Sequence, residues 1–180
     1  SSYDNTLIHR LSSNFVIQSG GYKWPSEPSN QEGGSPIRVS SKGAITNEPG
    51  NSNNLGTIAM AKVADNPDSA SSEWFINLTD NKNLDSQNGG FSVFGHILGD
   101  GIYNPLLLNN QTIYNVNYSQ VGLNLSELPL INVEDNVINN ANYFAIHKVS
   151  TISQRPSEIE NVFNVIVTAT DLNGNQSNQY

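Results

Sequence analysis

Apolar residues in this chain recur in short runs, separated by polar segments rich in Gly, Asn, Ser and Pro. Runs in which every second residue is apolar are typical of β-strands, whose successive side chains point to opposite faces of a sheet. The densest group predicts three strands, at residues 57–61, 73–78 and 91–97. Three strands this apolar in so short a span favour a closed or sandwiched antiparallel sheet, and therefore a mainly β fold.

The segments before this group predict more β structure and one long connection. Strands are expected at residues 6–8 and 15–18, the second ending at the pair Gly20 and Gly21. Residues 23–55 are dense in Pro, Gly, Ser and Asn and have no sustained periodicity. We therefore expect a long surface loop there.

After residue 97 the pattern is weaker. Pro105 is allowed in the first turn of a helix, and apolar residues follow it, so a short helix is expected at 105–110. Residues 126–132 are predicted to form a loop, and residues 142–152 a closing strand. These elements complete a first domain at residues 1–154.

The tail at residues 155–180 differs in character. Pro156 is expected to end the first domain, the segment 161–170 alternates like a strand, and residues 171–175 (DLNGN) carry a strong hairpin-turn signal. Two interpretations remain open. The tail is either a linker that leads into an immunoglobulin- or cadherin-like module, or an extra hairpin on the same domain.

Composition excludes several classes of function. The chain has 8 Lys and Arg against 16 Asp and Glu, a net charge of -8, so it lacks the clustered cations that nucleic-acid binding needs. It has no cysteine, which excludes disulfides, thiol catalysis and cysteine-based zinc sites. No apolar run approaches the ~20 residues of a membrane helix, so we expect no membrane insertion.

No pattern suggests a metal or a cofactor. The three histidines, His9, His96 and His147, lie on strand-like segments without the spacing of metal ligands, so we expect structural roles for them. There is also no nucleophile elbow, phosphate loop or dinucleotide-binding fingerprint. We therefore predict neither a metal nor a cofactor.

Two motifs in the expected order carry a family resemblance. The first comprises GTIAMAK, SEWFINL and LDSQNGGFSVFG within residues 56–95, and the second places His9 and Arg10 before Phe15 and Gln18. Together they resemble cyclophilin-type peptidyl-prolyl cis-trans isomerases, most closely the bacterial branch. The resemblance covers residues 3–96 well and 126–154 loosely, and it implies a closed, eight-stranded antiparallel β-barrel with short helices.

The sequence departs from this family at its N-terminus, where two strands and a helix of the family have no counterpart. A barrel without two strands would expose unpaired edges. Three explanations remain open: the sequence is a fragment, another chain supplies the strands, or the strand-like run at 162–170 fills the gap.

The resemblance also implies a chemistry. Rotation about an Xaa-Pro bond crosses a barrier of ~18–20 kcal/mol, and a catalyst must bind the twisted amide better than either planar isomer. By resemblance, Arg10 donates a hydrogen bond toward the prolyl nitrogen, and Gln18 contacts the substrate backbone and helps to hold Arg10. The alternative for Arg10 is a surface salt bridge.

The substrate-binding residues are also assigned by resemblance. Those that line or flank the pocket for proline are Phe15, Val16, Met60, Phe75, Leu84 and Phe91. Ala61 and Lys62 stand where the family pairs its backbone with the peptide, and Glu73 replaces a more usual Gln beside the groove, which places a negative charge near Arg10. For the apolar residues, ordinary barrel core is the alternative.

Two functions from different classes follow. The first is a prolyl isomerase that acts on proline-containing segments of peptides and folding proteins. The second is a catalytically weak, cyclophilin-like binding or structural module of a larger extracellular or filamentous assembly. Asn and Ser are frequent and Lys is scarce, a balance common in exported proteins, so we expect a periplasmic or extracellular location, with the cytoplasm as the alternative.

Overall fold

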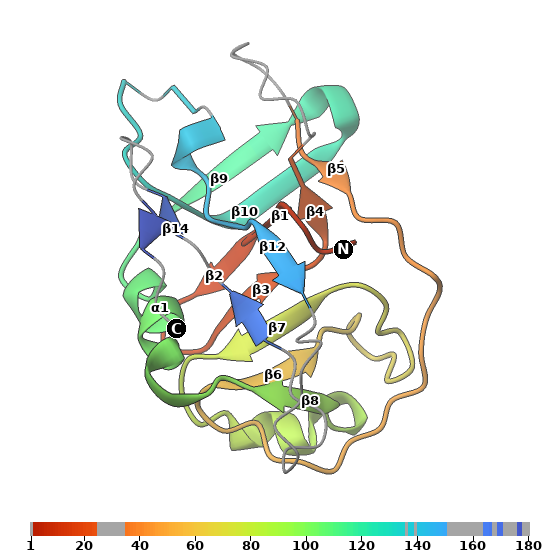
Figure 1. Cartoon of the computed structure of the whole chain (residues 1–180). Coiled ribbons are helices and arrows are strands. Elements are labelled where there is room, and N and C mark those ends of the chain that lie inside the picture. Colours follow the sequence, from red (N-terminus) through yellow and green to blue (C-terminus); the bar gives the residue numbers. More distant parts are fainter. Residues whose placement is uncertain are drawn as a thin grey trace.

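The computed structural model describes residues 2–24, 35–135, 137–138, 140–150, 164–166, 169–170 and 176–177 (Figure 1). Within these residues the protein is mainly β, with one short α-helix and several turns of 3-10 helix. No helix in the described part of the chain is long and apolar enough to cross a membrane. Two antiparallel sheets make up most of this fold.

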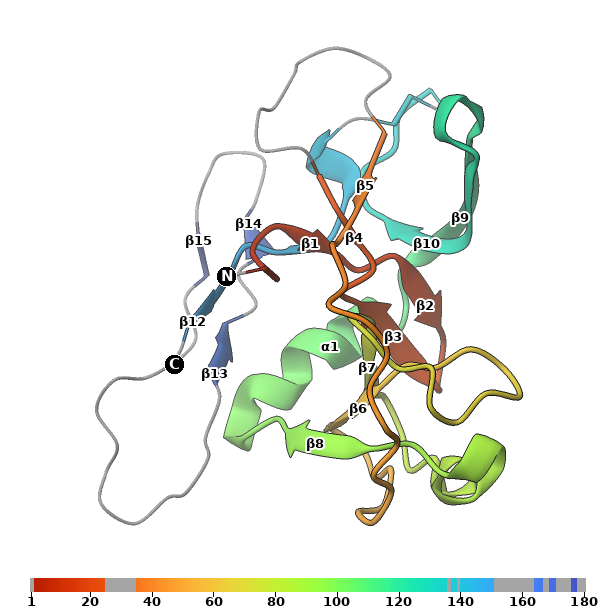
Figure 2. The same cartoon turned by 90° about the vertical axis from the view of Figure 1, so that its right-hand side faces the viewer.

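The larger sheet has five antiparallel strands. In spatial order these are β2 (Arg10–Ser12), β3 (Val16–Ser19), β7 (Trp74–Asn77), β6 (Thr57–Met60) and β8 (Val93–His96). The strands predicted at 57–61, 73–78 and 91–97 are therefore present, each slightly shorter than its apolar run. They lie side by side in both views (Figures 1 and 2).

The second sheet has four antiparallel strands. Their order is β11 (Ala145–Ile146), β1 (Thr6–Leu7), β4 (Tyr22–Lys23) and β5 (Ile37–Arg38). The chain passes between the two sheets over two consecutive residues. The Ile8 N–H donates to the Phe144 carbonyl beside the second sheet, and the His9 N–H donates to the Gln18 carbonyl of the first.

A β-hairpin lies against the open edge of β2. It consists of β9 (Thr112–Tyr118) and β10 (Leu123–Leu130), joined through a 3-10 turn and Gly122, whose φ is 65°. β10 packs against β2 without joining its sheet, and Figure 2 shows the hairpin beside β2. The hairpin therefore brings side chains from residues 112–130 to the edge where Arg10 lies.

The remaining elements are short. α1 spans Tyr103–Leu108, and the 3-10 helices are Lys82–Asp85, Gln87–Gly89, Gly99–Ile102, Ser119–Val121 and Asn140–Asn142. β12 (Lys148–Ser150) pairs with β13 (Asn164–Ile166), and β14 (Ala169–Thr170) pairs with β15 (Gln176–Ser177). The last pair flanks the predicted turn at 171–175, which lies outside the described residues.

The five-stranded sheet packs apolar side chains on both faces. Leu11, Ile17, Ile76 and Ile58 lie opposite one another across four strands and join Leu108 of α1 in one buried cluster. The other face carries a smaller cluster built on Val16, Phe75, Ala59 and Leu84. A third cluster, with Leu7 and Leu128 among its members, fills the space under the β9–β10 hairpin.

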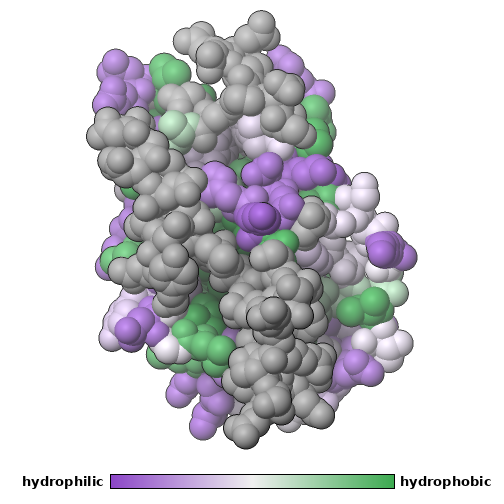
Figure 3. Space-filling model, in the orientation of Figure 1, coloured by the Kyte–Doolittle hydropathy of each residue, from purple (hydrophilic) through white to green (hydrophobic). Residues whose placement is uncertain are grey.

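Several large apolar side chains lie outside these clusters and are exposed. Leu107 of α1 is 69% exposed. Figure 3 shows apolar side chains on this face near α1, at the lower left.

The structure differs from four expectations. The described strands form separate sheets and not one closed barrel. The loop predicted at 23–55 contains β5, and the loop predicted at 126–132 is largely β10, because Pro129 is tolerated in a two-stranded ribbon. The helix begins and ends two residues before the predicted 105–110.

The proposed filling of the gap by residues 162–170 is also not seen. Of that run, β13 pairs with β12, and β14 pairs with β15. Neither strand joins the five-stranded sheet.

Candidate functional site

Five residues form a row across the larger sheet. Arg10, Gln18, Phe75, Ala59 and Val93 lie directly opposite one another on β2, β3, β7, β6 and β8. Directly opposed residues point to the same face of a sheet, so these side chains share one face. The row therefore joins two polar residues at one end to buried and half-buried apolar residues at the other.

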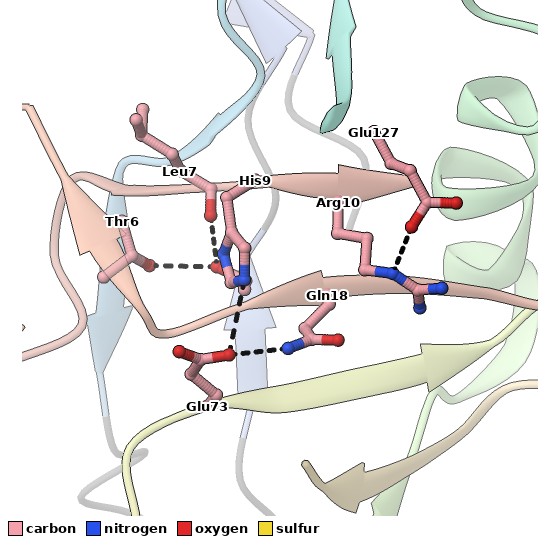
Figure 4. Close-up of polar contacts among 8 residues, drawn as sticks. Thr6, Leu7, His9, Arg10, Gln18, Glu73 and Glu127 are labelled. Carbon is pink, nitrogen blue, oxygen red and sulfur yellow. Dashed lines mark hydrogen bonds and ion pairs between the residues drawn. The ribbon is translucent and has the colours of Figure 1, made fainter. Parts of the chain in front are cut away.

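Arg10, at the polar end, forms an ion pair with a residue far away in the sequence. Its Nε–H donates to Oε2 of Glu127 on β10 at 2.6 Å, and the two side chains are 33% and 40% exposed (Figure 4). Both groups are charged, so this is a charge-assisted hydrogen bond. The surface ion pair considered for Arg10 is thus present, with a partner that the sequence did not suggest.

Gln18, beside Arg10, is held by a second carboxylate. Its Nε2 donates to Oε2 of Glu73 at 2.6 Å, and His9 Nε2 lies 3.4 Å from the same oxygen (Figure 4). The direct contacts of the Glu73 carboxylate are thus with Gln18 and His9. No hydrogen bond between Gln18 and Arg10 is present among the described residues.

The surroundings of Glu73 favour its charged form. The pKa of its carboxyl lies below the usual range, and the hydrogen bond from His9 is the largest cause. The hydrogen bond from Gln18 and the charge of Arg38 lower this pKa further, whereas partial burial raises it. His9 is 6% exposed and meets the Tyr22 ring edge-on, with centroids 5.1 Å apart. The structural role expected for this histidine thus includes holding Glu73.

The apolar end of the row is a small cluster with a partly exposed rim. Val16, Phe75 and Leu84 are buried, whereas Phe15 and Phe91 are half-buried against them. The rings of Phe75 and Phe91 meet at 77° with centroids 5.6 Å apart, an edge-to-face packing. Five of the six residues predicted to bind proline are therefore gathered in one place.

Met60 is the exception. It is paired with Trp74 and packs against the cluster on the opposite face of the sheet. Successive residues of a strand point to opposite faces, so Met60 lies away from Ala59 and the row. The structure thus separates Met60 from the other predicted pocket residues.

Ala61 and Lys62 follow β6 and border the apolar cluster. The Ala61 N–H already donates to the Glu73 carbonyl at 2.9 Å. The Lys62 ammonium lies 4.5 Å from the Phe91 ring centroid and donates to the carbonyls of Asn88 and Gly90. Burial lowers the pKa of Lys62. Its side chain therefore holds the segment before Phe91 in place.

A surface hollow lies next to the row. It has a volume of about 410 Å³ and is lined by Asn51, Ser52, Asn54, Thr57, Val93, Phe94, Gly95 and His96. It shares only Val93 with the row, so it extends the surface beyond the apolar end. In the described part of the chain, no three His, Asp or Glu side chains gather as metal ligands would.

Comparisons with known proteins give the family of this chain. The chain is 37% identical to a peptidyl-prolyl cis-trans isomerase of Acinetobacter baylyi, over 53% of this chain and 47% of the relative. It is 36% identical to peptidyl-prolyl cis-trans isomerase B of Escherichia coli, over 56% and 58%. The chain thus spans about half the length of the curated relatives that it matches.

A solved structure gives a weaker match. The cyclophilin-type peptidyl-prolyl cis-trans isomerase of Cryptosporidium parvum, crystallised in the presence of the dipeptide Ala-Pro, is 24% identical with a TM-score of 0.45. The match covers 71% of this chain and 69% of that one.

The family model matches more than half of the chain. Residues 1–112 match the model of the cyclophilin-type peptidyl-prolyl cis-trans isomerase family. These residues contain β1 to β8 and α1, and with them Arg10, Gln18 and the apolar cluster. The chain therefore belongs to the cyclophilin-type peptidyl-prolyl cis-trans isomerase family.

Proposed function

We propose that this chain accelerates the cis-trans interconversion of Xaa-Pro bonds in peptide segments that lie along the row. The observation that carries the proposal is the sharing of one sheet face by Arg10, Gln18 and the apolar cluster. A proline ring packed on Phe15 and Phe91 would place its amide toward Arg10 and Gln18. The relatives named as isomerases support the same activity.

The chemistry requires no cofactor. When the amide twists, its nitrogen regains a lone pair and becomes a better hydrogen-bond acceptor. Arg10 would donate to this nitrogen, and Gln18 would hold the peptide backbone, so both would stabilise the twisted amide more than either planar isomer. An acceleration of ~10⁵ corresponds to about 7 kcal/mol of such preferential binding.

The proposed binding residues differ in role. Phe15 and Phe91 are the half-buried part of the apolar cluster that a proline would contact, and the buried Val16, Phe75 and Leu84 support them. Ala61 and Lys62 border this cluster. Glu73 acts through Gln18 and not through direct contact with proline. Met60 supports the sheet from its other face.

The test is exchange NMR on a short peptide that contains Ala-Pro, with native chain, Arg10→Ala and Lys42→Ala at equal concentration. Lys42 is exposed and lies outside all five strands of the row, so its replacement removes one positive charge without altering a residue of the site. We expect the native chain and Lys42→Ala to accelerate exchange and Arg10→Ala to lose at least tenfold, because about 1.4 kcal/mol of stabilisation is a factor of ten in rate. Equal rates for all three proteins would contradict the proposal.

A peptide-binding module without turnover is the second candidate. It is favoured by the ion pair that already occupies Arg10. Line broadening of the peptide without faster isomerisation would support this candidate and reject the enzyme.

Two further proposals come from the sequence. We propose a periplasmic or extracellular location, which fractionation of the source cells would test.

We also propose that strands from a second chain are one way to complete the barrel. The mass of the protein in solution would test this, because a complex would be heavier than one chain.

A further inference from the structure

The guanidinium of Arg10 is held at one nitrogen only. Within the described residues, Nε–H donates to Glu127 at 2.6 Å, and the structure shows no partner for the two terminal amino groups. A guanidinium is a rigid, planar fork, so fixing Nε also fixes the direction of its other donors. The ion pair therefore orients Arg10 without using the groups that a ligand would meet.

A β-bulge aims Glu127 at this site. Leu125 pairs with Val116 and Leu128 with Tyr114, so two residues of β10 oppose a single residue of β9 between these pairs. Leu125 and Leu128 are 6% and 0% exposed. Bulges of this kind re-aim side chains. Here the extra residue lets Glu127 reach β2 while the leucines on either side stay in the core.

We propose that Glu127 is a positioning residue, whose carboxylate holds Arg10 in the orientation that stabilises the twisted prolyl amide. This inference rests on the proposed function and extends it. Glu127 lies beyond residues 1–112, which match the family model, so this partner comes from the chain's own hairpin. The opposite role, a carboxylate that competes with the peptide for Arg10, predicts the opposite effect of its removal.

The experiment compares native chain with Glu127→Ala, Glu127→Gln and Glu134→Ala. Glu134 is exposed and follows β10, so its replacement removes the same charge outside the site. The first measurement, without peptide, is the ¹⁵N–¹H signal of Arg10 Nε–H and its exchange with water. We expect slow exchange in native chain and Glu134→Ala, fast exchange in Glu127→Ala, and an intermediate rate in Glu127→Gln, whose amide oxygen still accepts.

The second measurement is the isomerisation of the Ala-Pro peptide at several peptide concentrations. We expect kcat of Glu127→Ala to fall by about tenfold with little change in KM, because a misdirected catalytic group costs rate more than binding. Glu127→Gln should lose only about threefold, since a neutral acceptor gives roughly half the strength of a charged one. Thermal unfolding of each variant confirms that it is folded.

The outcomes separate the two proposals. A Glu127→Ala variant that matches or exceeds the native kcat overturns the positioning role and leaves the isomerase intact. Slow exchange of the Arg10 Nε–H with water in Glu127→Ala would also overturn the positioning role. If the native chain does not accelerate cis-trans isomerisation of the Ala-Pro peptide at all, the proposed function fails and the positioning role fails with it.

Discussion

At the scale of single residues, two carboxylates set the polar end of the site. Glu127 accepts from Arg10, and Glu73 accepts from Gln18, each at 2.6 Å. Because Gln18 Nε2 donates to Glu73, the Gln18 amide oxygen is the atom that, under the proposed function, would accept from a peptide N–H. A glutamate at position 73 therefore fixes the direction of a side chain that the family motif had already identified.

Glu73 makes a prediction about the pH dependence of stability. Its carboxyl has a lowered pKa in the folded state, so it stabilises the fold above the ordinary value of 4.5, and this contribution is lost as the pH falls through the folded-state pKa. Glu73→Gln should therefore lower the free energy of unfolding at pH 7, and the deficit should shrink below pH 4.5. Urea unfolding at pH values from 7 to below 4.5 measures this loss of unfolding free energy, with Glu134→Gln as the charge control. A deficit that does not change with pH would show that packing, not charge, is lost.

At the scale of elements, period-two patterns located four of the five strands that carry the row, and missed β2. β6, β7 and β8 were predicted because each is a run of apolar or alternating residues bounded by polar turns. β9 and the strand character of β10 were missed. β9 does carry a period-two pattern, since half-buried Tyr114, Val116 and Tyr118 alternate with exposed asparagines. In β10, Pro129 argues against a strand unless the strand lies in a ribbon.

Gly20 provides a prediction at this scale, because it turns the chain from β3 to β4. Its φ is +81°, and a Cβ there would lie 2.3 Å from the Ser72 carbonyl oxygen. Gly122 has a φ of +65° and open space around it. Gly122→Ala should cost roughly 1–2 kcal/mol for its left-handed backbone alone. Gly20→Ala should cost a further 1–3 kcal/mol, approximately, for the clash. Equal losses in denaturant titrations would rule out the clash.

At the scale of the whole molecule, neighbouring residues bind separate cores into one unit. Leu7 belongs to the cluster under the hairpin and Ile8 to the cluster beneath the five-stranded sheet. The ion pair between Arg10 and Glu127 joins the same two regions at their surface. Loosening of the β9–β10 hairpin would therefore also disturb the candidate site.

Core truncations test this coupling. Leu11 and Leu128 are both 0% exposed, in different clusters, and Leu→Ala at each should cost about 2–5 kcal/mol in a single unfolding transition. Leu107→Ala, at a 69% exposed position, should change stability by less than about 0.5 kcal/mol. Two transitions in fluorescence and circular dichroism, one of them unaffected by Leu128→Ala, would show that the hairpin unfolds independently.

The sequence alone determined the family and four of the five strands of the larger sheet, and it named candidate residues for the site. These features depend on residues that lie close together within a motif, so strand alternation and fixed offsets encode them. Tertiary structure alone decided which groups hold the two polar residues and where Met60 points. Glu127 is 117 residues from Arg10, and Glu73 is 55 residues from Gln18. Contacts over such separations depend on the register of the sheet, the bulge in β10 and the packing of a hairpin, none of which a local pattern contains.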